Sequence, residues 1–180
     1  MSLITEQSRQ ALADAFFSAA RAGLLRAQED ALEIQPRTVG AVAGAADDTV
    51  LVITTSSFGF RLLIMFHVDV TPESRTYYGG SPDAGLQPAF AEIANLCCGA
   101  LNRELSRDFP HLGMSIPYLL NAHCMGCLDE LKPDHVAHYA ITVNGSVRLQ
   151  ATLCICCSAP VQITPRQHAA AETTGELELF

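Results

Sequence analysis

The sequence predicts an α+β fold, in which helices pack on one face of an antiparallel β-sheet. Apolar residues recur at helical spacing over residues 6–34 and again over residues 87–107. Several short runs of strand-forming residues lie between turn signals, which is typical of adjacent antiparallel strands. Asn144-Gly145, the strongest short signal for a β-hairpin, separates two further runs of apolar alternation.

The N-terminal half is expected to hold one helix and then a meander of three strands. The helix covers residues 6–34, and Pro36 marks its end. Its core-facing stripe is Leu12, Ala15, Phe16, Ala19, Ala20 and Gly23. The strands are expected at residues 37–45, 49–55 and 60–69. Residues 71–85 are rich in Pro and Gly, so we expect a long loop there.

The C-terminal half begins with a helix over residues 87–107 and continues into strands. The strands are expected at residues 114–120, 122–128, 136–143 and 146–158. In the last strand, the two faces are Val147, Leu149, Ala151, Leu153, Ile155 and Cys157 against Arg148, Gln150, Thr152, Cys154 and Cys156. We expect a single domain over residues 1–164 and a disordered tail over residues 165–180.

Composition excludes several classes of function. The net charge is −8 without a basic run, so nucleic acid is not expected as a partner. No run approaches 18 apolar residues, and the N-terminus lacks a secretory signal, so no membrane association is expected. Seven cysteines without such a signal indicate free thiols in a reducing compartment, and we therefore expect a cytoplasmic protein.

The helix over residues 87–107 has an unusual polar face. At about 100° per residue, its apolar arc holds Phe90, Ile93, Cys97, Leu101 and Leu105, with Ala100 at the edge. The opposite arc holds Glu92, Asn95, Gly99, Asn102, Arg103 and Ser106. Glu92 and Asn95 are neighbours at i,i+3, and Gly99 leaves room for another molecule to approach. The alternative interpretation is an ordinary solvated face.

The spacing E-x-x-N-x-x-x-G at Glu92, Asn95 and Gly99, followed by Met114-Ser115-Ile116-Pro117, resembles the CheX-like chemotaxis phosphatases, which are related to CheC and FliY. The resemblance implies a CheC/CheX-like fold. It also implies a phosphatase that hydrolyses the aspartyl phosphate of a response-regulator receiver domain. Glu92 would then anchor the receiver, and Asn95 would position the attacking water.

The resemblance carries further expectations about partners and cofactors. Gly99, Asn102 and Arg103 would contact the receiver from the same face of the helix. The receiver would bring its own Mg²⁺, and the chain would need no cofactor. One copy of the motif is the pattern of the CheX-like members, so a homodimer is expected. The sequence departs from the family pattern at Ala100, where Asn is frequent, and around residues 77–88, where a helix is usual.

The cysteines form a second group of candidates. Cys124, Cys127, Cys154 and Cys156 are weak candidates for a zinc site, because their spacing is not a usual zinc pattern. On a strand, Cys124 and Cys127 would point to opposite faces. The other interpretations are small apolar residues or redox groups. Cys154 and Cys156 would need a cover, either a dimer interface or a packed helix. His111, His135, His138 and His168 are interpreted as isolated surface or loop residues.

Two alternatives to the phosphatase therefore stay open. The first is a non-catalytic module of the same fold that docks a receiver or forms a dimer. The second is a cysteine-based metal or redox sensor.

Overall fold

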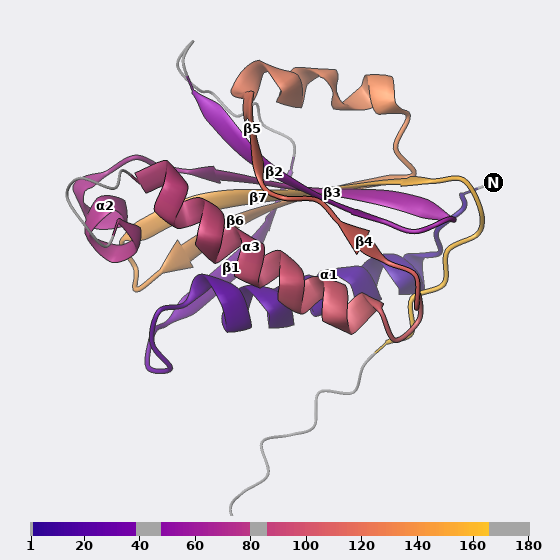
Figure 1. Ribbon diagram of the computed structural model, residues 1–180, viewed down its shortest axis with the longest axis horizontal. Helices are drawn as coiled ribbons and strands as arrows, with labels where there is room; N and C mark the ends of the chain where they lie inside the picture. Colours follow the sequence, from indigo (N-terminus) through magenta and orange to yellow (C-terminus); the bar gives the residue numbers. More distant parts are fainter. Residues whose placement is uncertain (1, 39–47, 80–85, 166–180) are drawn as a thin grey trace, which may run out of the picture.

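The centre of the structure is an antiparallel sheet of seven strands in the order β1-β6-β7-β3-β2-β4, with β5 also pairing with β2 (Figure 1). The computed structural model describes residues 2–38, 48–79 and 86–165. The elements are α1 (Glu6–Leu24), β1 (Leu32–Arg37), β2 (Thr49–Ser56), β3 (Phe60–Val68), α2 (Pro72–Tyr78), α3 (Leu86–Leu105), β4 (Gly113–Met114), β5 (Tyr118–Asn121), the 3₁₀ helix η1 (Ala122–Leu131), β6 (His135–Val143) and β7 (Val147–Cys157). The predicted fold class is confirmed.

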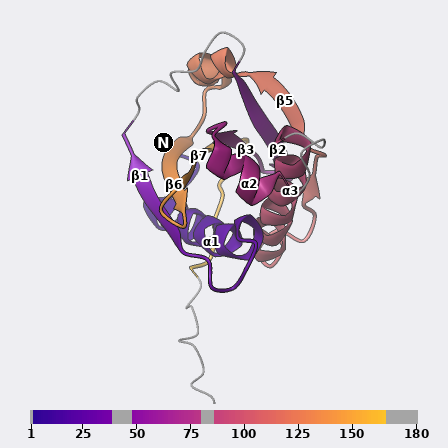
Figure 2. The same cartoon turned by 90° about the vertical axis from the view of Figure 1, so that its left-hand side faces the viewer.

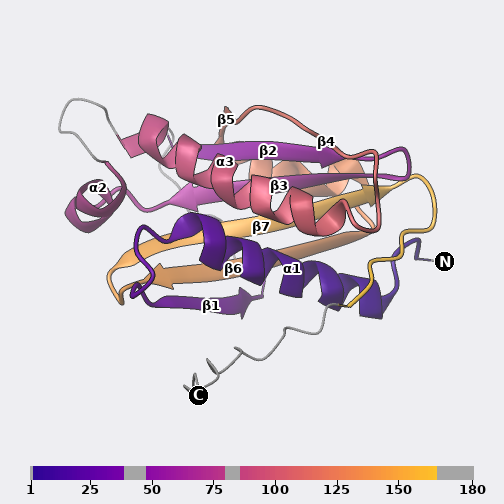
Figure 3. The same ribbon diagram turned by 60° about the horizontal axis from the view of Figure 1, so that its bottom comes forward.

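The two long helices pack on one face of the sheet, as predicted. α1 and α3 lie side by side and run in opposite directions (Figure 3). We call the face under them the helix face. The shorter helix η1 covers part of the opposite face, which we call the outer face, so the sheet lies between two layers (Figure 2). Within the described ranges, no helix has the combination of length and apolar character needed to cross a bilayer.

The core on the helix face is built around aromatic rings from helices and strands. Phe16 of α1 stacks on Tyr139 of β6, with ring centroids 5.6 Å apart. Phe66 of β3 contacts Phe90 of α3 edge to face at 6.0 Å. Phe16, Phe66 and Phe90 are each at most 2% exposed. Burial of such large apolar surfaces fixes both helices on the sheet.

α1 ends ten residues earlier than predicted, because the chain turns and becomes the edge strand β1. The described strand Leu32–Arg37 pairs with β6. The predicted first strand, residues 37–45, is therefore wrong at its start, and residues 39–45 lie outside the described residues. Pro36 falls within β1, where a missing N–H is tolerated because the strand lies at the sheet edge. The predicted tail also lies outside the described residues, except for Pro165.

The carboxylate of Asp30, in the turn after α1, forms hydrogen bonds within that turn and with two segments that are distant in the sequence. It accepts hydrogen bonds from the Tyr77 hydroxyl at 2.6 Å, the Asn144 side-chain amide at 2.7 Å and the Ala27 N–H at 2.8 Å. The bond from Tyr77, followed by that from Asn144, lowers the pKa of Asp30 from 3.8 to about 2. The α1–β1 turn, α2 and the β6–β7 hairpin thus meet at one ionised group.

We expect Asp30→Asn to lower stability at neutral pH and to lose this effect in acid. The folded-state pKa lies below the unfolded value, so the stabilisation is present above pH 3.8 and is lost as the pH falls towards about 2. Urea unfolding midpoints of the wild type and the variant should therefore converge over this range. Glu29→Gln, at a neighbouring exposed position, is the control. If the difference between the two midpoints stayed constant down to about pH 2, the stabilisation could not be assigned to the ionised Asp30 carboxylate.

The predicted loop over residues 71–85 is wrong for its first half, which forms α2. Thr71 caps this helix, because its hydroxyl accepts from the Ser74 N–H at 3.2 Å while the Ser74 hydroxyl accepts from the Thr71 N–H at 2.9 Å. Pro72 occupies the first turn, where it is tolerated. A helix is therefore present between β3 and α3. The chain departs less from the family pattern around residues 77–88 than the sequence indicated. Residues 80–85 lie outside the described residues.

The predicted strand over residues 122–128 is wrong, because this segment forms η1. The Asn121 side chain accepts from the His123 N–H at its start, and Lys132 ends it with a left-handed backbone, φ 49°. The predicted strand over residues 114–120 is two short strands, β4 and β5, on the edge of β2. A 3₁₀ helix repeats every three residues, so Ala122, Met125 and Leu128 share one stripe.

The stripe of η1 packs on a second, smaller core on the outer face. Its buried members are Val50, Val52, Met65, Ala122, Leu128 and Cys154. The predicted faces of β7 are confirmed, since Leu149, Leu153 and Ile155 join the core on the helix face while Cys154 and Cys156 join this one. η1 is the packed helix that these two cysteines were expected to need.

Candidate functional site

The segment Leu86–Leu105 forms a helix because it is rich in helix-forming residues and its apolar residues fall on one continuous stripe. The buried residues are Leu86, Phe90, Ala94, Cys97, Cys98, Ala100, Leu101 and Leu105. Ile93, which was placed in the apolar arc, is only partly buried. Ala100 is 8% exposed, so it lies at the edge of the core as expected. α3 is thereby held rigidly, with its other side turned outward.

The outward side presents the residues of the sequence motif. Glu92 and Arg103 are exposed, and Asn95, Gly99 and Asn102 are half-buried. Among the described residues, neither Glu92 nor Asn95 makes a hydrogen bond or an ion pair within the chain. A carboxylate and an amide one turn apart on a fixed helix therefore keep their full hydrogen-bonding capacity for another molecule.

Leu96 is the residue of this face that the sequence analysis missed. It follows Asn95 directly, lies one turn after Glu92, and is 61% exposed. A hydrophobic pattern counts leucine as core, so only its position between two polar motif residues could have shown that it points outward. An exposed leucine beside an unpaired acid and amide is typical of a protein-binding surface.

Gly99 is not required by the packing of the described residues. A Cβ built at this position has the Arg103 Nη1 atom at 3.7 Å as its nearest contact, an ordinary van der Waals distance. Glycine within a helix costs about 1 kcal/mol relative to alanine. The contacts among the described residues therefore do not explain why position 99 lacks a side chain.

The segment that follows α3 is fixed to the same edge of the sheet. The Ser115 N–H donates to the Thr54 carbonyl at 2.8 Å, and the Thr54 N–H donates to the Ser115 hydroxyl at 3.0 Å. Ile116 lies just beyond and is 81% exposed. The Asn102 Oδ1 atom is buried and has no hydrogen-bond partner in the described part of the chain. The Ser115-Ile116-Pro117 segment thus lies alongside β2, the strand that α3 also contacts.

The thiols differ in burial: Cys97, Cys98 and Cys154 are buried, Cys124, Cys156 and Cys157 are half-buried, and Cys127 is exposed. Burial raises the pKa of Cys97 to about 12, and burial together with Cys156 raises that of Cys154 to about 12. Burial, with a further contribution from Cys127, also raises the pKa of Cys124. A raised pKa lowers the thiolate fraction and hence the reactivity. This agrees with the interpretation of these cysteines as small apolar residues.

The four zinc candidates are not brought together. Cys124 and Cys127 lie three residues apart on η1, whereas Cys154 and Cys156 lie beneath it on β7. Over the described ranges, no three His, Cys, Asp or Glu side chains are grouped so that they could hold a metal ion. The prediction that Cys124 and Cys127 point in opposite directions is also wrong, because positions i and i+3 of a 3₁₀ helix coincide.

Comparison with known proteins identifies the fold. No protein-family model and no curated protein matches the sequence. CheX from Borrelia burgdorferi, solved as a complex with CheY, BeF₃ and Mg²⁺, aligns with a TM-score of 0.53 at 12% identity, covering 82% of this chain and 97% of that one. A CheC-like superfamily protein from Shewanella sp. PV-4 aligns with a TM-score of 0.51 at 11% identity, covering 84% and 98%.

The same architecture occurs in a protein that is named neither CheX nor CheC-like. The middle domain of FliM from Vibrio alginolyticus aligns with a TM-score of 0.54 at 10% identity, covering 81% of this chain and 92% of that one. At such identities the likeness concerns the fold alone. The argument for a function therefore has to come from the side chains on α3.

Proposed function

The chain has the fold of the CheX and CheC-like proteins, and we propose that it is a phosphatase for the aspartyl phosphate of a response-regulator receiver domain. The observation that carries this proposal is the pair Glu92 and Asn95, held on one side of a rigid helix without partners among the described residues. We assign receiver anchoring to Glu92 and positioning of the attacking water to Asn95.

The chemistry of the reaction suits a neutral amide. An acyl phosphate is already reactive, so the remaining task is to hold a water molecule in line with the phosphorus atom, and positioning of this kind is worth several kcal/mol. The Asn95 amide can both accept a hydrogen bond from water and donate one. It carries no charge that would repel the phosphoryl oxygens. No metal and no covalent intermediate on this chain are part of the proposal.

Glu92 suits the other task. A carboxylate would repel the phosphoryl group at close range, so one turn away from Asn95 it is better suited to bind a cation of the partner, such as a lysine. Truncating one member of a desolvated charge pair costs about 2–5 kcal/mol of binding free energy. The complex of CheX with CheY, BeF₃ and Mg²⁺ supports a receiver as the partner.

We expect Gly99→Ala to separate stability from binding. The added methyl group has no close contact with the described residues, so the free energy of unfolding should rise by about 1 kcal/mol. The same methyl group would stand on the docking surface, so the concentration of protein needed for half-maximal acceleration of receiver dephosphorylation should rise. Urea unfolding and a concentration series measure the two effects. A stabilised variant with unchanged half-maximal concentration would show that the receiver does not approach Gly99.

The direct test is the decay of a phosphorylated receiver domain from the same genome, measured with and without this protein. Acceleration at catalytic amounts supports the phosphatase. Unchanged decay in several receivers that nevertheless bind the protein would favour the second candidate, a docking module of the same fold. The homodimer and the cytoplasmic location belong to the same proposal, and sedimentation of the purified protein measures the first of them.

A further inference from the structure

The outer face of the sheet contains a cavity that the proposed phosphatase does not use. It has a volume of about 520 Å³ and lies between η1 and the strands β1, β6 and β7. This is within the range of small-molecule sites, about 300–1,000 Å³. α3 and its motif lie on the helix face, on the other side of the sheet (Figures 1 and 2). The cavity is therefore separate from the candidate phosphatase site.

The cavity exists because the outer face changes character along the sheet. Where η1 packs, the sheet offers Met65 and Cys154 to Ala122 and Leu128. Further towards β1, the side chains on the same face become polar. These include the buried Thr152 and the half-buried Gln150 and His138, all of which line the cavity. The space between the helix and this polar region is the cavity.

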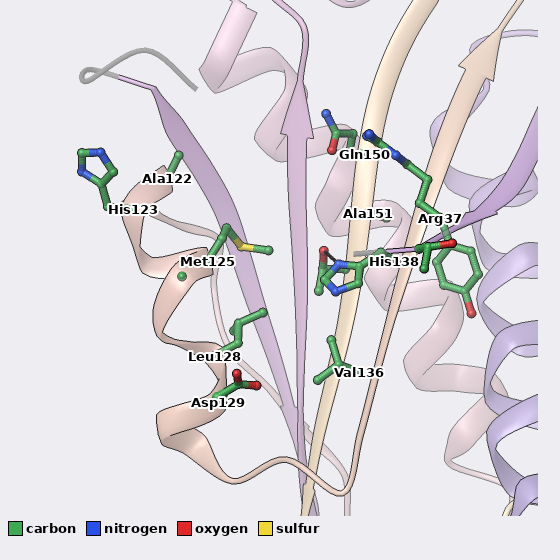
Figure 4. Close-up of a pocket in the computed structure, with 14 residues that line it drawn as sticks. Arg37, Ala122, His123, Met125, Leu128, Asp129, Val136, His138, Gln150 and Ala151 are labelled. Carbon is green, nitrogen blue, oxygen red and sulfur yellow. Dashed lines mark hydrogen bonds between the residues drawn. The ribbon is translucent and has the colours of Figure 1, made fainter. Parts of the chain in front are cut away.

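The walls are apolar in one part and carry hydrogen-bonding groups in another. Figure 4 shows Met125 and Leu128 of η1 facing Val136 of β6, with Arg37 and Gln150 together at one end. Among the described residues, Arg37 makes no ion pair, so its guanidinium is free for an anionic group. A planar guanidinium binds carboxylates and related oxyanions with two parallel hydrogen bonds.

His138 lies in the middle of the cavity and is oriented by the strand beside it. Its Nδ1 atom shares a hydrogen bond of 2.9 Å with the hydroxyl of Thr152, which is only 4% exposed. Burial, and then the charge of Arg37, lowers the pKa of His138. The lowered pKa favours the neutral ring, which leaves Nε2 as an additional hydrogen-bonding group. Asp129 and His123, both exposed on η1, and the buried Tyr139 of β6 are the other titratable groups that line the cavity.

From this geometry we infer that the cavity binds a small amphipathic organic anion. Its carboxylate or sulfonate pairs with Arg37 beside Gln150, and its aromatic or aliphatic body lies between Met125, Leu128 and Val136. The inference is independent of the proposed phosphatase function, because none of the motif residues of α3 lines the cavity.

Anilinonaphthalene sulfonate is a suitable probe, because it joins an aromatic body to one sulfonate and fluoresces in apolar surroundings. We expect saturable binding to one site per chain and displacement by octanoate, an aliphatic monoanion. Arg37→Gln should weaken binding about tenfold, as expected for the loss of a charged hydrogen-bonding partner. Arg148→Gln is the matched control, since Arg148 is also exposed on the outer face but does not line the cavity.

Two further measurements keep the result specific. Val136→Phe should fill the apolar end and reduce binding without removing charge. Amide NMR shift changes on adding the probe should be concentrated in η1 and β6. Unsaturable binding, an equal loss in Arg37→Gln and Arg148→Gln, or shift changes centred on α3 would each overturn the inference. The decay of a phosphorylated receiver is read separately, so failure here leaves the phosphatase proposal untouched, and the converse also holds.

Discussion

Replacing Asn95 by alanine is expected to lower the acceleration of receiver dephosphorylation by about 100-fold, because one preorganised hydrogen-bonding group in an active site is worth about 10²–10³ in rate. The Asn95 side chain has no partner among the described residues and lies on the side of α3 that faces away from the sheet, so the fold should be unaffected. The measurement is the single-turnover decay rate of a phosphorylated receiver at saturating protein. Binding should stay close to that of the wild type.

Two comparisons make this result specific. Glu92→Gln should instead raise the concentration for half-maximal acceleration by about tenfold or more, with a smaller effect at saturation, because it removes an anchoring charge. Gln10→Ala, which removes an exposed amide from α1, should change neither quantity. If Asn95→Ala retained the full rate at saturation, the water-positioning role would be ruled out and the docking module would be the better account.

Replacing Gly23 by alanine is expected to reduce the free energy of unfolding by about 3 kcal/mol, the upper end of the usual cost of overpacking. A Cβ on Gly23 would overlap the backbone Cα and N atoms of Cys97 and lie 2.8 Å from its Cβ atom. These atoms belong to the backbone of α3, so no side-chain rotation can relieve the overlap. α1 and α3 would have to move apart, which would also open the core around Phe16 and Phe90.

The urea midpoint measures this effect, with Gly99→Ala as the matched control in the opposite direction. Both variants exchange a helical glycine for alanine, but only one position faces another backbone. A loss of stability in Gly23→Ala with a gain in Gly99→Ala would establish that the helix–helix contact is responsible. Equal changes in both variants would contradict the close packing of the two helices.

The parts of the fold that the sequence predicted are those with a long or unambiguous local pattern. α1 and α3 each present several turns of apolar residues to the core, and Asn144-Gly145 supplies the two positive φ angles that a tight hairpin requires. The alternation along β7 correctly separated its two faces. These signals depend on neighbours in sequence, so tertiary contacts were not needed to find them.

The missed elements are short or have an unusual period. α2 has seven residues, too few for a helical stripe, and its capping box at Thr71 and Ser74 was the available signal. η1 repeats every three residues, which neither the strand nor the α-helix template matches. Without η1 there is no cavity beside His138, so that residue could only be interpreted as isolated. The shared position of Glu92 and Asn95 on the polar face was predicted by the helical spacing, whereas their lack of partners among the described residues and the exposure of Leu96 required the structure.

The three-residue period of η1 also restricts how its length can change. The stripe Ala122, Met125 and Leu128 contacts the sheet, and the stripe Cys124 and Cys127 does not. Inserting or deleting a single residue would rotate the remainder of the helix by about 120° and exchange one stripe for another. Only changes of three residues keep the apolar stripe on the sheet. Length variation in this segment should therefore occur in whole turns, or else before Asn121 and after Lys132, where the helix begins and ends.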